Sequence, residues 1–357
     1  MKEALDLLSC LVACPSPSGK EAAISELTAG VVEELGLKCE HVGESVLAYA
    51  QRCDPKILYV SHLDTVPVGA GWSVDPFAAR WIGDQLVGRG ACDAKASAAA
   101  MLWSLSEAAK EGAADGVVVA LTTCEETTNT GMGDVLGRLG MPELAVVGEP
   151  TGLEVVRAQG GLAIIEAEWR GKSCHAAHAY HTSHTNALVE ASKELGSFGF
   201  VHELPSEVGL LGPTTIVPTV MNAGERHNVV PDAATAIFDC RLSPPHDAAT
   251  CLDRIALSLP GASLRIRSDR LKAIETGADH RLVQVALGIA GKDSAIGSNT
   301  LSDMALLQGV PAIKCGPGDS LRSHKPDEFV TEEEFLAGCH FYRDLLFALV
   351  REAVAFA

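Results

Sequence analysis

Four short apolar runs in the sequence each lead into residues that can bind a metal ion. The runs are followed by His62 and Asp64, by Glu125 and Glu126, by Glu149, and by His324, and Asp93 comes after a glycine-rich turn at Gly88–Cys92. Two histidines and several carboxylates form the kind of ligand set that binds catalytic divalent ions. We therefore predict a two-metal hydrolytic site, provided that the fold brings these residues together.

The elements that carry these residues predict where they meet. The runs Ile57–Val60, Val117–Leu121, Leu144–Gly148 and Pro311–Ile313 are short, continuous and mostly β-branched or small. Such runs are typical of strands buried on both faces, as in a mostly parallel sheet flanked by helices. Ligands of open α/β sheets bind beyond the carboxyl ends of the strands. All the candidate ligands are therefore expected at one edge of an α/β sheet.

The adjacent pair Glu125-Glu126 indicates a division of labour. Two neighbouring side chains of an extended segment cannot point the same way. One glutamate could therefore bind metal while the other faces the substrate as a base, as metal-assisted hydrolysis requires.

The pattern changes between residues 161 and 275. Half-buried, partly alternating strands are expected at 164–169, 236–241 and 264–267, with helices near 186–197 and 247–259. This composition predicts an α+β lid or dimerisation domain, 161–275, inserted into a discontinuous catalytic domain, 1–160 and 276–357. Helices are also expected at 94–109 and 332–355.

Composition excludes several classes of partner. The net charge of −18 and the lack of Lys/Arg runs argue against nucleic acid and anionic membranes. No window approaches the ~20 apolar residues of a membrane span. The eleven cysteines are scattered without a CxxC pair, which favours a reducing cytoplasm over a disulfide framework.

The motifs resemble a known family over almost the whole chain. The matching segments, in order and spacing, are Ser61–Pro67, Gly88–Lys95, Glu125-Glu126, Gly148–Thr151 and Gly316–Asp319 with His324. They are similar to the zinc deacylases and carboxypeptidases that include acetylornithine deacetylase, succinyl-diaminopimelate desuccinylase, aminoacylase and carboxypeptidase G. Ala96-Ser97 departs from the small pair, often Gly-Gly, that this family usually has there.

The resemblance implies a role for each residue of the site. His62 and Glu149 would hold one zinc ion, Glu126 and His324 the other, and Asp93 would bridge them, with cobalt able to substitute. Asp64 would orient His62, Glu125 would be the general base, and a cis peptide is expected at Asp93-Ala94.

Further roles follow for the inserted domain and the substrate. His175 matches the oxyanion-stabilising histidine, expected to act across a homodimer interface, and Asn228 and Arg241 match positions that bind the substrate carboxylate. The backbone N–H groups of Gly316 and Gly318 are expected to complete that clamp. The further histidines at 178, 181 and 184 are interpreted as a loop rather than a metal array.

One stretch of the sequence favours a particular substrate. The Gly316–Phe329 stretch is most similar to arginine-pathway deacetylases, which favours N-acetyl-L-ornithine. N-acetylcitrulline, carrier-protein-linked lysine or ornithine, succinyl-diaminopimelate and dipeptides remain alternatives, because only the pocket shape distinguishes them. A catalytically silent relative is a further alternative, against which the complete ligand set and Glu125 argue.

Overall fold

The structure is a computed structural model that describes residues 1–180, 185–207 and 209–353. It divides into two compact units. Unit 1 comprises residues 1–157, 275–296 and 302–357, and unit 2 comprises residues 158–274 and 297–301. The segment 297–301 groups with unit 2, although it was expected in the discontinuous domain. There the Gly160 N–H donates to the Ser298 carbonyl at 3.0 Å.

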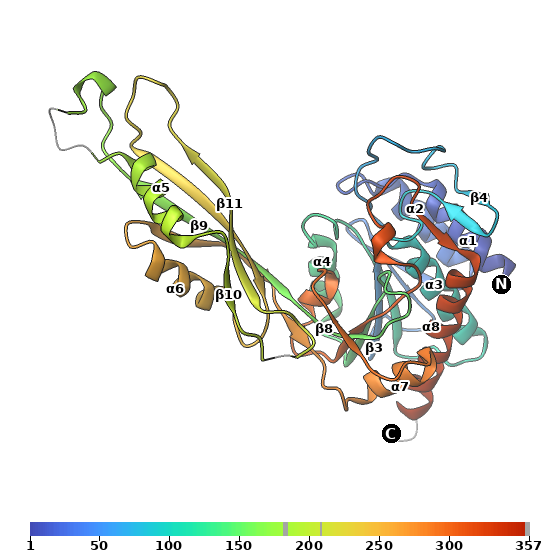
Figure 1. The fold of residues 1–357 in the computed structure, drawn as a ribbon. Helices are drawn as coiled ribbons and strands as arrows, with labels where there is room; N and C mark the ends of the chain where they lie inside the picture. Colours follow the sequence, from blue (N-terminus) through green and yellow to red (C-terminus); the bar gives the residue numbers. More distant parts are fainter. Residues whose placement is uncertain (181–184, 208, 354–357) are drawn as a thin grey trace. The chain divides into compact units, whose positions relative to one another are not determined.

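Unit 1 is built on a mixed sheet whose central strands are parallel (Figure 1). The strand order is β1-β2-β6-β3-β7-β16-β8-β14, and β15 also pairs with β8. These strands are β1 (Lys38–Val42), β2 (Ser45–Tyr49), β3 (Ile57–His62), β6 (Val117–Thr122), β7 (Leu144–Val147), β8 (Val156–Gln159), β14 (Ile274–Glu275), β15 (Ile296–Ser298) and β16 (Ala312–Lys314). Every residue of β3 and β6 is buried. The predicted α/β fold class is confirmed.

Helices cover this sheet and supply most of its core. They are α1 (Lys2–Ala13), α2 (Ala22–Glu34), α3 (Lys95–Lys110), α4 (Thr130–Leu139), α7 (Arg281–Ala290) and α8 (Glu332–Ala353), with 3₁₀ turns η2 (Asp303–Leu306) and η3 (Ser320–Arg322). A small sheet in the order β17-β5-β4 joins Phe329–Thr331, Gln85–Val87 and Arg80–Ile82. The alanine-rich α3 is buried along most of its length. Alanine suits that position because it favours helix and allows close packing on all sides.

Unit 2 is an antiparallel sheet with helices on one face. The strand order is β10-β11-β12-β9-β13, formed by His202–Leu204, Thr214–Ala223, Ala233–Leu242, Gly161–Arg170 and Ser263–Leu271. Burial alternates along β9, as a sheet with one covered face requires. The helices α5 (Ala187–Phe198) and α6 (Ala248–Ser258) pack on the covered face, and a 3₁₀ turn η1 spans Ala176–His178.

Several local predictions can be compared directly with these elements. Both helices of unit 2 begin one residue after their expected starts, because the side chains of Asn186 and Asp247 cap α5 and α6. The strand β11 was missed, because Pro218 and a bulge between Pro218 and Val220 interrupt its pattern. His181 and His184 lie outside the described residues, as do residues 354 and 355 of the last expected helix. In the described part of the chain, no helix has the length and apolarity of a membrane span.

Candidate metal centre

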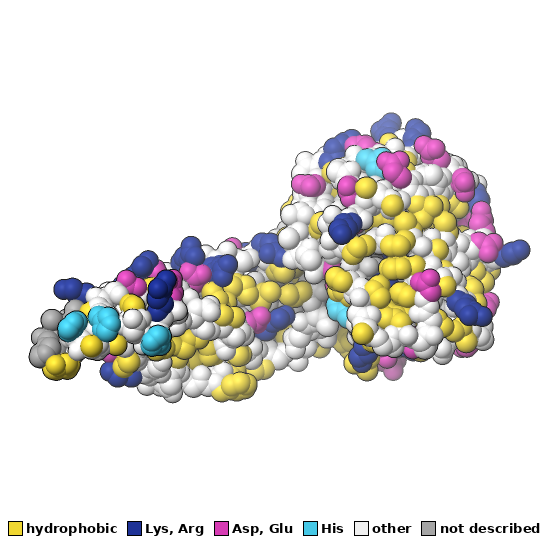
Figure 2. All heavy atoms as spheres, turned by 90° about the horizontal axis from the view of Figure 1, so that it is seen from above, with side chains coloured by type: hydrophobic (Ala, Val, Ile, Leu, Met, Phe, Trp, Pro, Cys, Tyr) yellow, Lys and Arg dark blue, Asp and Glu magenta, His cyan; other side chains and the backbone are white. Residues whose placement is uncertain are grey.

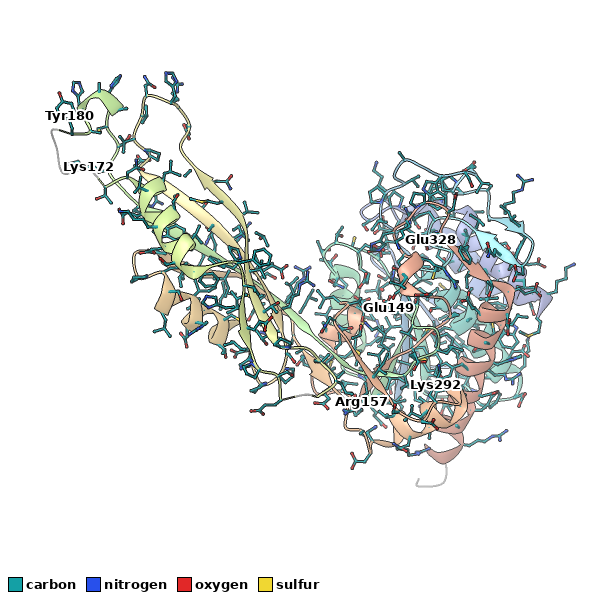
Figure 3. All side chains as sticks on the ribbon, in the orientation of Figure 1. Glu149, Arg157, Lys172, Tyr180, Lys292 and Glu328 are labelled. Carbon is teal, nitrogen blue, oxygen red and sulfur yellow. The ribbon has the colours of Figure 1, made fainter. Side chains whose placement is uncertain are left out.

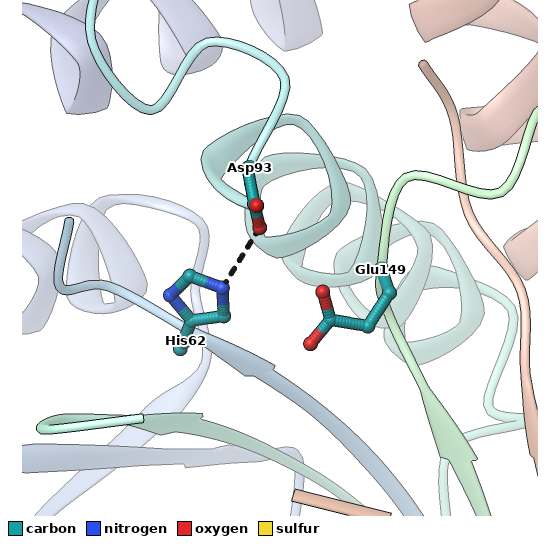
Figure 4. A group of neighbouring side chains, drawn as sticks. All are labelled: His62, Asp93 and Glu149. Atoms are coloured by element: carbon teal, nitrogen blue, oxygen red, sulfur yellow. Dashed lines mark hydrogen bonds and ion pairs between the residues drawn. The ribbon is translucent and has the colours of Figure 1, made fainter. Parts of the chain in front are cut away.

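The candidate ligands form two groups in unit 1 that share Asp93. His62 ends β3, and its Nε2 lies 3.1 Å from Asp93 Oδ1, with Glu149 completing the first group (Figure 4). In the second group, His324 Nε2 lies 3.4 Å from Asp93 Oδ2 and 3.0 Å from Glu126 Oε1. Within each group the ligand atoms lie within 4.8 Å of one another. Asp93 thus presents one carboxylate oxygen to each histidine.

The donor chemistry fits divalent metal ions. Asp93, Glu126 and Glu149 place three partly buried carboxylates together, and each group includes one imidazole nitrogen. Nitrogen and carboxylate oxygen are ordinary zinc ligands. The His62 side chain is only 1% exposed, whereas His324 is 51% exposed, so the second group is the more open one.

The electrostatics of the site indicate an excess of negative charge. Burial raises the pKa of Glu149 to about 8, an effect that the charge of Asp93 reinforces and that His62 and Lys314 oppose. Burial alone would lower the pKa of His62, but its hydrogen bond with Asp93 and nearby glutamates hold it well above the usual value. A bound cation would relieve this carboxylate repulsion.

The buried ammonium of Lys314 was not singled out from the sequence. Lys314 ends β16 and is 1% exposed, and burial lowers its pKa against the opposing charge of Glu149. A lysine in a predominantly apolar strand carries no sequence signal that it faces a carboxylate cluster.

Asp93 is positioned by Glu328, which no sequence motif assigned to the site. The Glu328 Oε1 atom accepts the main-chain N–H groups of Cys92 and Asp93, both at 3.0 Å. Its Oε2 accepts the Arg89 guanidinium at 2.6 Å, and both side chains are at most 2% exposed. Figure 3 labels Glu149 and Glu328 within unit 1. The peptide bond between Asp93 and Ala94 is cis, as the resemblance implied.

Asp64 contacts both His62 and the glutamate pair. The main-chain oxygen of Asp64 lies 2.9 Å from His62 Nδ1, whereas its carboxylate Oδ1 is 3.7 Å away. That carboxylate instead accepts the main-chain N–H groups of Glu125 at 3.0 Å and Glu126 at 3.2 Å, and the Ser18 hydroxyl at 2.6 Å. The structure thus places Asp64 against His62 through its main-chain oxygen, while its side chain positions the glutamate pair.

The proposed base Glu125 lies beside the ligands without belonging to either group. Burial raises the pKa of Glu125 well above its usual value, and Glu149 and Asp303 add to this while His62 opposes it. Its Oε1 lies 3.5 Å from the Asn129 amide nitrogen. A carboxyl group with raised proton affinity next to metal ligands suits general-base chemistry.

The two glycines expected to bind substrate do not present free N–H groups as a pair. The Gly316 N–H donates to Thr151 Oγ1 at 3.1 Å, and both Gly316 and Gly318 are buried. A Cβ atom on Gly316 would lie 2.6 Å from the main-chain oxygen of Glu149, and one on Gly318 would lie 2.6 Å from Cys92 Sγ. The expectation is therefore wrong for the Gly316 N–H, which is already donated, and it stays a prediction for Gly318. Both positions need glycine for close packing around the site.

The remaining predicted residues lie at two ends of unit 2. His175 and Asn228 are exposed neighbours, since the Asn228 carbonyl accepts the Ala176 N–H at 2.9 Å. Arg241 lies near the other end of β12 and pairs with Asp239 at 2.8 Å. The eight residue steps from Ala233 to Arg241 span about 26 Å in an extended strand. Asn228 and Arg241 of one chain therefore cannot clamp the same carboxylate, and their shared role stays a prediction that needs residues from two chains.

The end of unit 2 that carries His175 is rich in polar side chains. Figure 3 labels Lys172 and Tyr180 at this end, and Figure 2 shows histidine side chains gathered there. His175 accepts the Ala177 N–H on Nδ1 at 3.1 Å, which leaves Nε2 as its other ring nitrogen for an external partner.

A family model matches most of this chain. The model of peptidase family M20/M25/M40 covers residues 58–348, a range that includes every candidate metal ligand. The chain belongs to this family.

Individual M20 relatives span both deacylases and peptidases. The chain is 30% identical over 292 residues to an acetylornithine deacetylase of Myxococcus xanthus, covering 78% of this chain and 76% of the relative. It is also 30% identical over 314 residues to an N-acetyl-L-citrulline deacetylase of Xanthomonas campestris, covering 82% and 81%.

Solved M20 structures share the fold at low sequence identity. A tripeptidase of Staphylococcus aureus matches with a TM-score of 0.77 at 19% identity, covering 98% of each chain. A Bacillus subtilis protein described as a dinuclear metal-binding peptidase matches with a TM-score of 0.75 at 17% identity, again over 98% of each chain. Together with the family match, these relatives confirm the predicted family and indicate a metallohydrolase that acts on amide bonds.

Proposed function

We propose that the protein is a two-metal amidohydrolase that removes the acyl group from an N-acyl amino acid, with N-acetyl-L-ornithine as preferred substrate. The proposal rests on the position of Asp93, whose two carboxylate oxygens face the histidines of the two ligand groups. Glu125 lies beside these groups. His62 and Glu149 would hold one zinc ion and Glu126 and His324 the other, with Asp93 between the two.

The chain's own residues supply the steps of the reaction. Zinc ions bound there would provide the Lewis acidity that polarises an amide carbonyl and lowers the pKa of water. Glu125 takes the proton of the attacking water and returns it to the leaving amine. The acetyl group leaves as acetate and the amine as the free amino acid.

Unit 2 would supply the contacts that bind substrate and stabilise the oxyanion. His175 donates a hydrogen bond to the developing oxyanion, an interaction worth about 3–4 kcal/mol. Arg241 and Asn228 bind substrate carboxylate. Because these groups lie at opposite ends of β12, we propose a homodimer in which one subunit supplies His175 and Asn228 and the other supplies Arg241.

The choice of an acetyl group rests on relatives and on charge. Both deacetylases that are 30% identical act, by their names, on N-acetyl amino acids. A succinyl group would bring a second carboxylate, and the sequence offers no spare basic cluster for it. N-acetylcitrulline is the second candidate, favoured by the Xanthomonas relative.

A substrate panel on purified protein tests the proposal. Activity on N-acetyl-L-ornithine, N-acetyl-L-citrulline, succinyl-diaminopimelate and a dipeptide is measured before chelation, after chelation, and after addition of Zn²⁺ or Co²⁺. We expect chelation to abolish hydrolysis and either metal to restore it. A kcat/KM at least about tenfold higher for the succinyl compound or the dipeptide would overturn the substrate. Undiminished activity in metal-free protein would overturn the mechanism.

A further inference from the structure

The carboxylate of Glu125 is connected to a buried acid through one amide side chain. Asn129 Nδ2 lies 3.0 Å from Asp303 Oδ1 and 3.5 Å from Glu125 Oε1. On its other oxygen, Asp303 Oδ2 accepts the hydroxyl of Thr122 at 2.7 Å. Thr122 is the last residue of β6 and Asp303 begins η2, so the connection runs from the sheet to the base through residues far apart in sequence.

The chemistry of the neighbours fixes the orientation of the Asn129 amide. An ionised carboxylate can only accept hydrogen bonds, and the asparagine NH₂ group has two hydrogens to donate. With the Asp303 carboxylate 3.0 Å away, the amide must present its nitrogen rather than its oxygen, and the same nitrogen faces Glu125. The side chain is also confined, because Asn129 is 5% exposed and Asp303 is 2% exposed.

The backbone places Asn129 over the glutamate pair. Its φ of 54° is left-handed, a conformation that asparagine tolerates better than most residues. Its main-chain N–H donates to the Cys124 carbonyl at 2.7 Å, which closes the loop that contains Glu125 and Glu126. The closed loop and the Asn129 amide therefore both restrict the side chain of Glu125.

We propose that Asn129, held in place by Asp303, is a positioning residue that directs the Glu125 carboxylate toward the attacking water. The inference rests on the proposed function, because it takes Glu125 as the general base. A base must lie about 2.6–3.2 Å from the proton donor to act, and a carboxylate free to rotate spends less time there. Asp303 acts through Asn129 and has no contact with the substrate in this scheme.

The first test separates positioning from folding and from metal binding. Asn129→Gly removes the amide and keeps the left-handed backbone, which glycine adopts without strain. We expect kcat to fall about 10- to 100-fold, with KM and the metal content per chain unchanged. Thr128→Ala is the matched control: Thr128 is exposed in the same loop, and its substitution should leave all three quantities unchanged.

A double-mutant cycle tests whether Asp303 works through Asn129. Asp303→Ala should lower kcat about as much as Asn129→Gly, and the double variant should be no worse than either single one. Asp303→Asn keeps an acceptor oxygen for the amide, so it should recover most of the activity lost in Asp303→Ala. The melting temperature of each metal-free variant shows whether the variant is folded. If Asp303→Ala does not fold, the kcat of Asp303→Asn tests the role of Asp303 in its place.

Three outcomes decide the inference. An unchanged kcat in Asn129→Gly would overturn it while leaving the proposed function intact. A fall in kcat matched by an equal fall in metal content would also overturn it, because the loop would then support the ligand Glu126 instead. If Glu125→Gln retains full activity, the proposed function itself fails, and with it the role of Asn129.

Discussion

The carboxylate Oδ1 of Asp64 lies 3.0 Å from the main-chain nitrogen of Glu125, closer than to the ring of His62. This contact anchors the start of the loop that carries the proposed base and its neighbouring ligand. Asp64 is fully buried, so leaving either of its carboxylate oxygens without a hydrogen bond would cost more free energy than it would in water. The residue that the motif places beside a metal ligand thus also fixes the backbone of the catalytic loop.

Asp64→Asn should therefore impair the glutamate pair more than the His62 ring. An amide replaces one acceptor oxygen by a donor, which would face an N–H group of Glu125 or Glu126. We expect kcat/KM to fall about 10- to 100-fold, while the main-chain contact to His62 persists. Steady-state kinetics and metal analysis measure both effects. Ser18→Ala, which removes the hydroxyl donor to Asp64, should cost less, and an equal loss would contradict this assignment.

Glu125 and Glu126 should respond differently to the same substitution. Glu125→Gln removes the proton acceptor, so kcat should fall at least about 100-fold with metal content unchanged. Glu126→Gln weakens a ligand of the more open group, so the metal content should fall and activity should depend on added Zn²⁺. Metal analysis after dialysis, combined with kinetics, distinguishes the two. Equal metal loss in both variants would show that the roles are wrongly divided.

His175 should be exchangeable between subunits if the homodimer proposal is correct. His175→Ala should lower kcat strongly, by an amount that corresponds to about 3–4 kcal/mol, with metal content unchanged. Mixing inactive Glu125→Ala and His175→Ala proteins under subunit exchange should regenerate activity, because some active sites combine an intact base with an intact histidine. The measurement is activity in heterodimers isolated with two different affinity tags. Heterodimers without activity would exclude delivery of His175 by the partner subunit.

The sequence predicted the parts of this molecule that local pattern determines. The runs at β3, β6 and β7 are continuous and apolar, so their parallel arrangement and the ligands after them could be anticipated. Glu328 and Asp303 could not, because they act on loops that lie 235 and 174 residues away in sequence, respectively. Gly316 was misinterpreted for a related reason: a glycine in a turn does not show whether its N–H is already donated.

The buried pair Arg89–Glu328 should be needed for stability as well as for the position of Asp93. Glu328→Ala leaves the Arg89 guanidinium buried without its carboxylate and leaves two main-chain N–H groups without an acceptor. Removing one partner of a buried pair costs about 3–5 kcal/mol. Urea unfolding should show this loss. Glu332→Ala is a control that we expect to change stability little, because Glu332 is exposed at the start of α8. A change below about 1 kcal/mol in Glu328→Ala would contradict the interpretation.

Lys95 gives a stability prediction with a defined sign in pH. Its ammonium donates to the main-chain oxygens of Leu11 at 3.0 Å and Cys14 at 2.8 Å, and burial lowers its pKa to about 8. The unfolded chain keeps this proton until about pH 10.4. Between these values the unfolded state binds more protons than the folded state, so the contribution of Lys95 to the free energy of unfolding rises with pH.

Comparison with Lys95→Met isolates this effect, because the other titrating groups are common to both proteins. The wild-type free energy of unfolding minus that of the variant should increase from pH 8 to pH 10 by up to about 1.4 kcal/mol per pH unit. Below pH 8 the difference should be nearly constant, since Lys95 is protonated in both states. Urea titrations at pH 7, 8, 9 and 10 measure it. A difference that falls over this range would mean that the folded protein holds the Lys95 proton more tightly than the unfolded chain does.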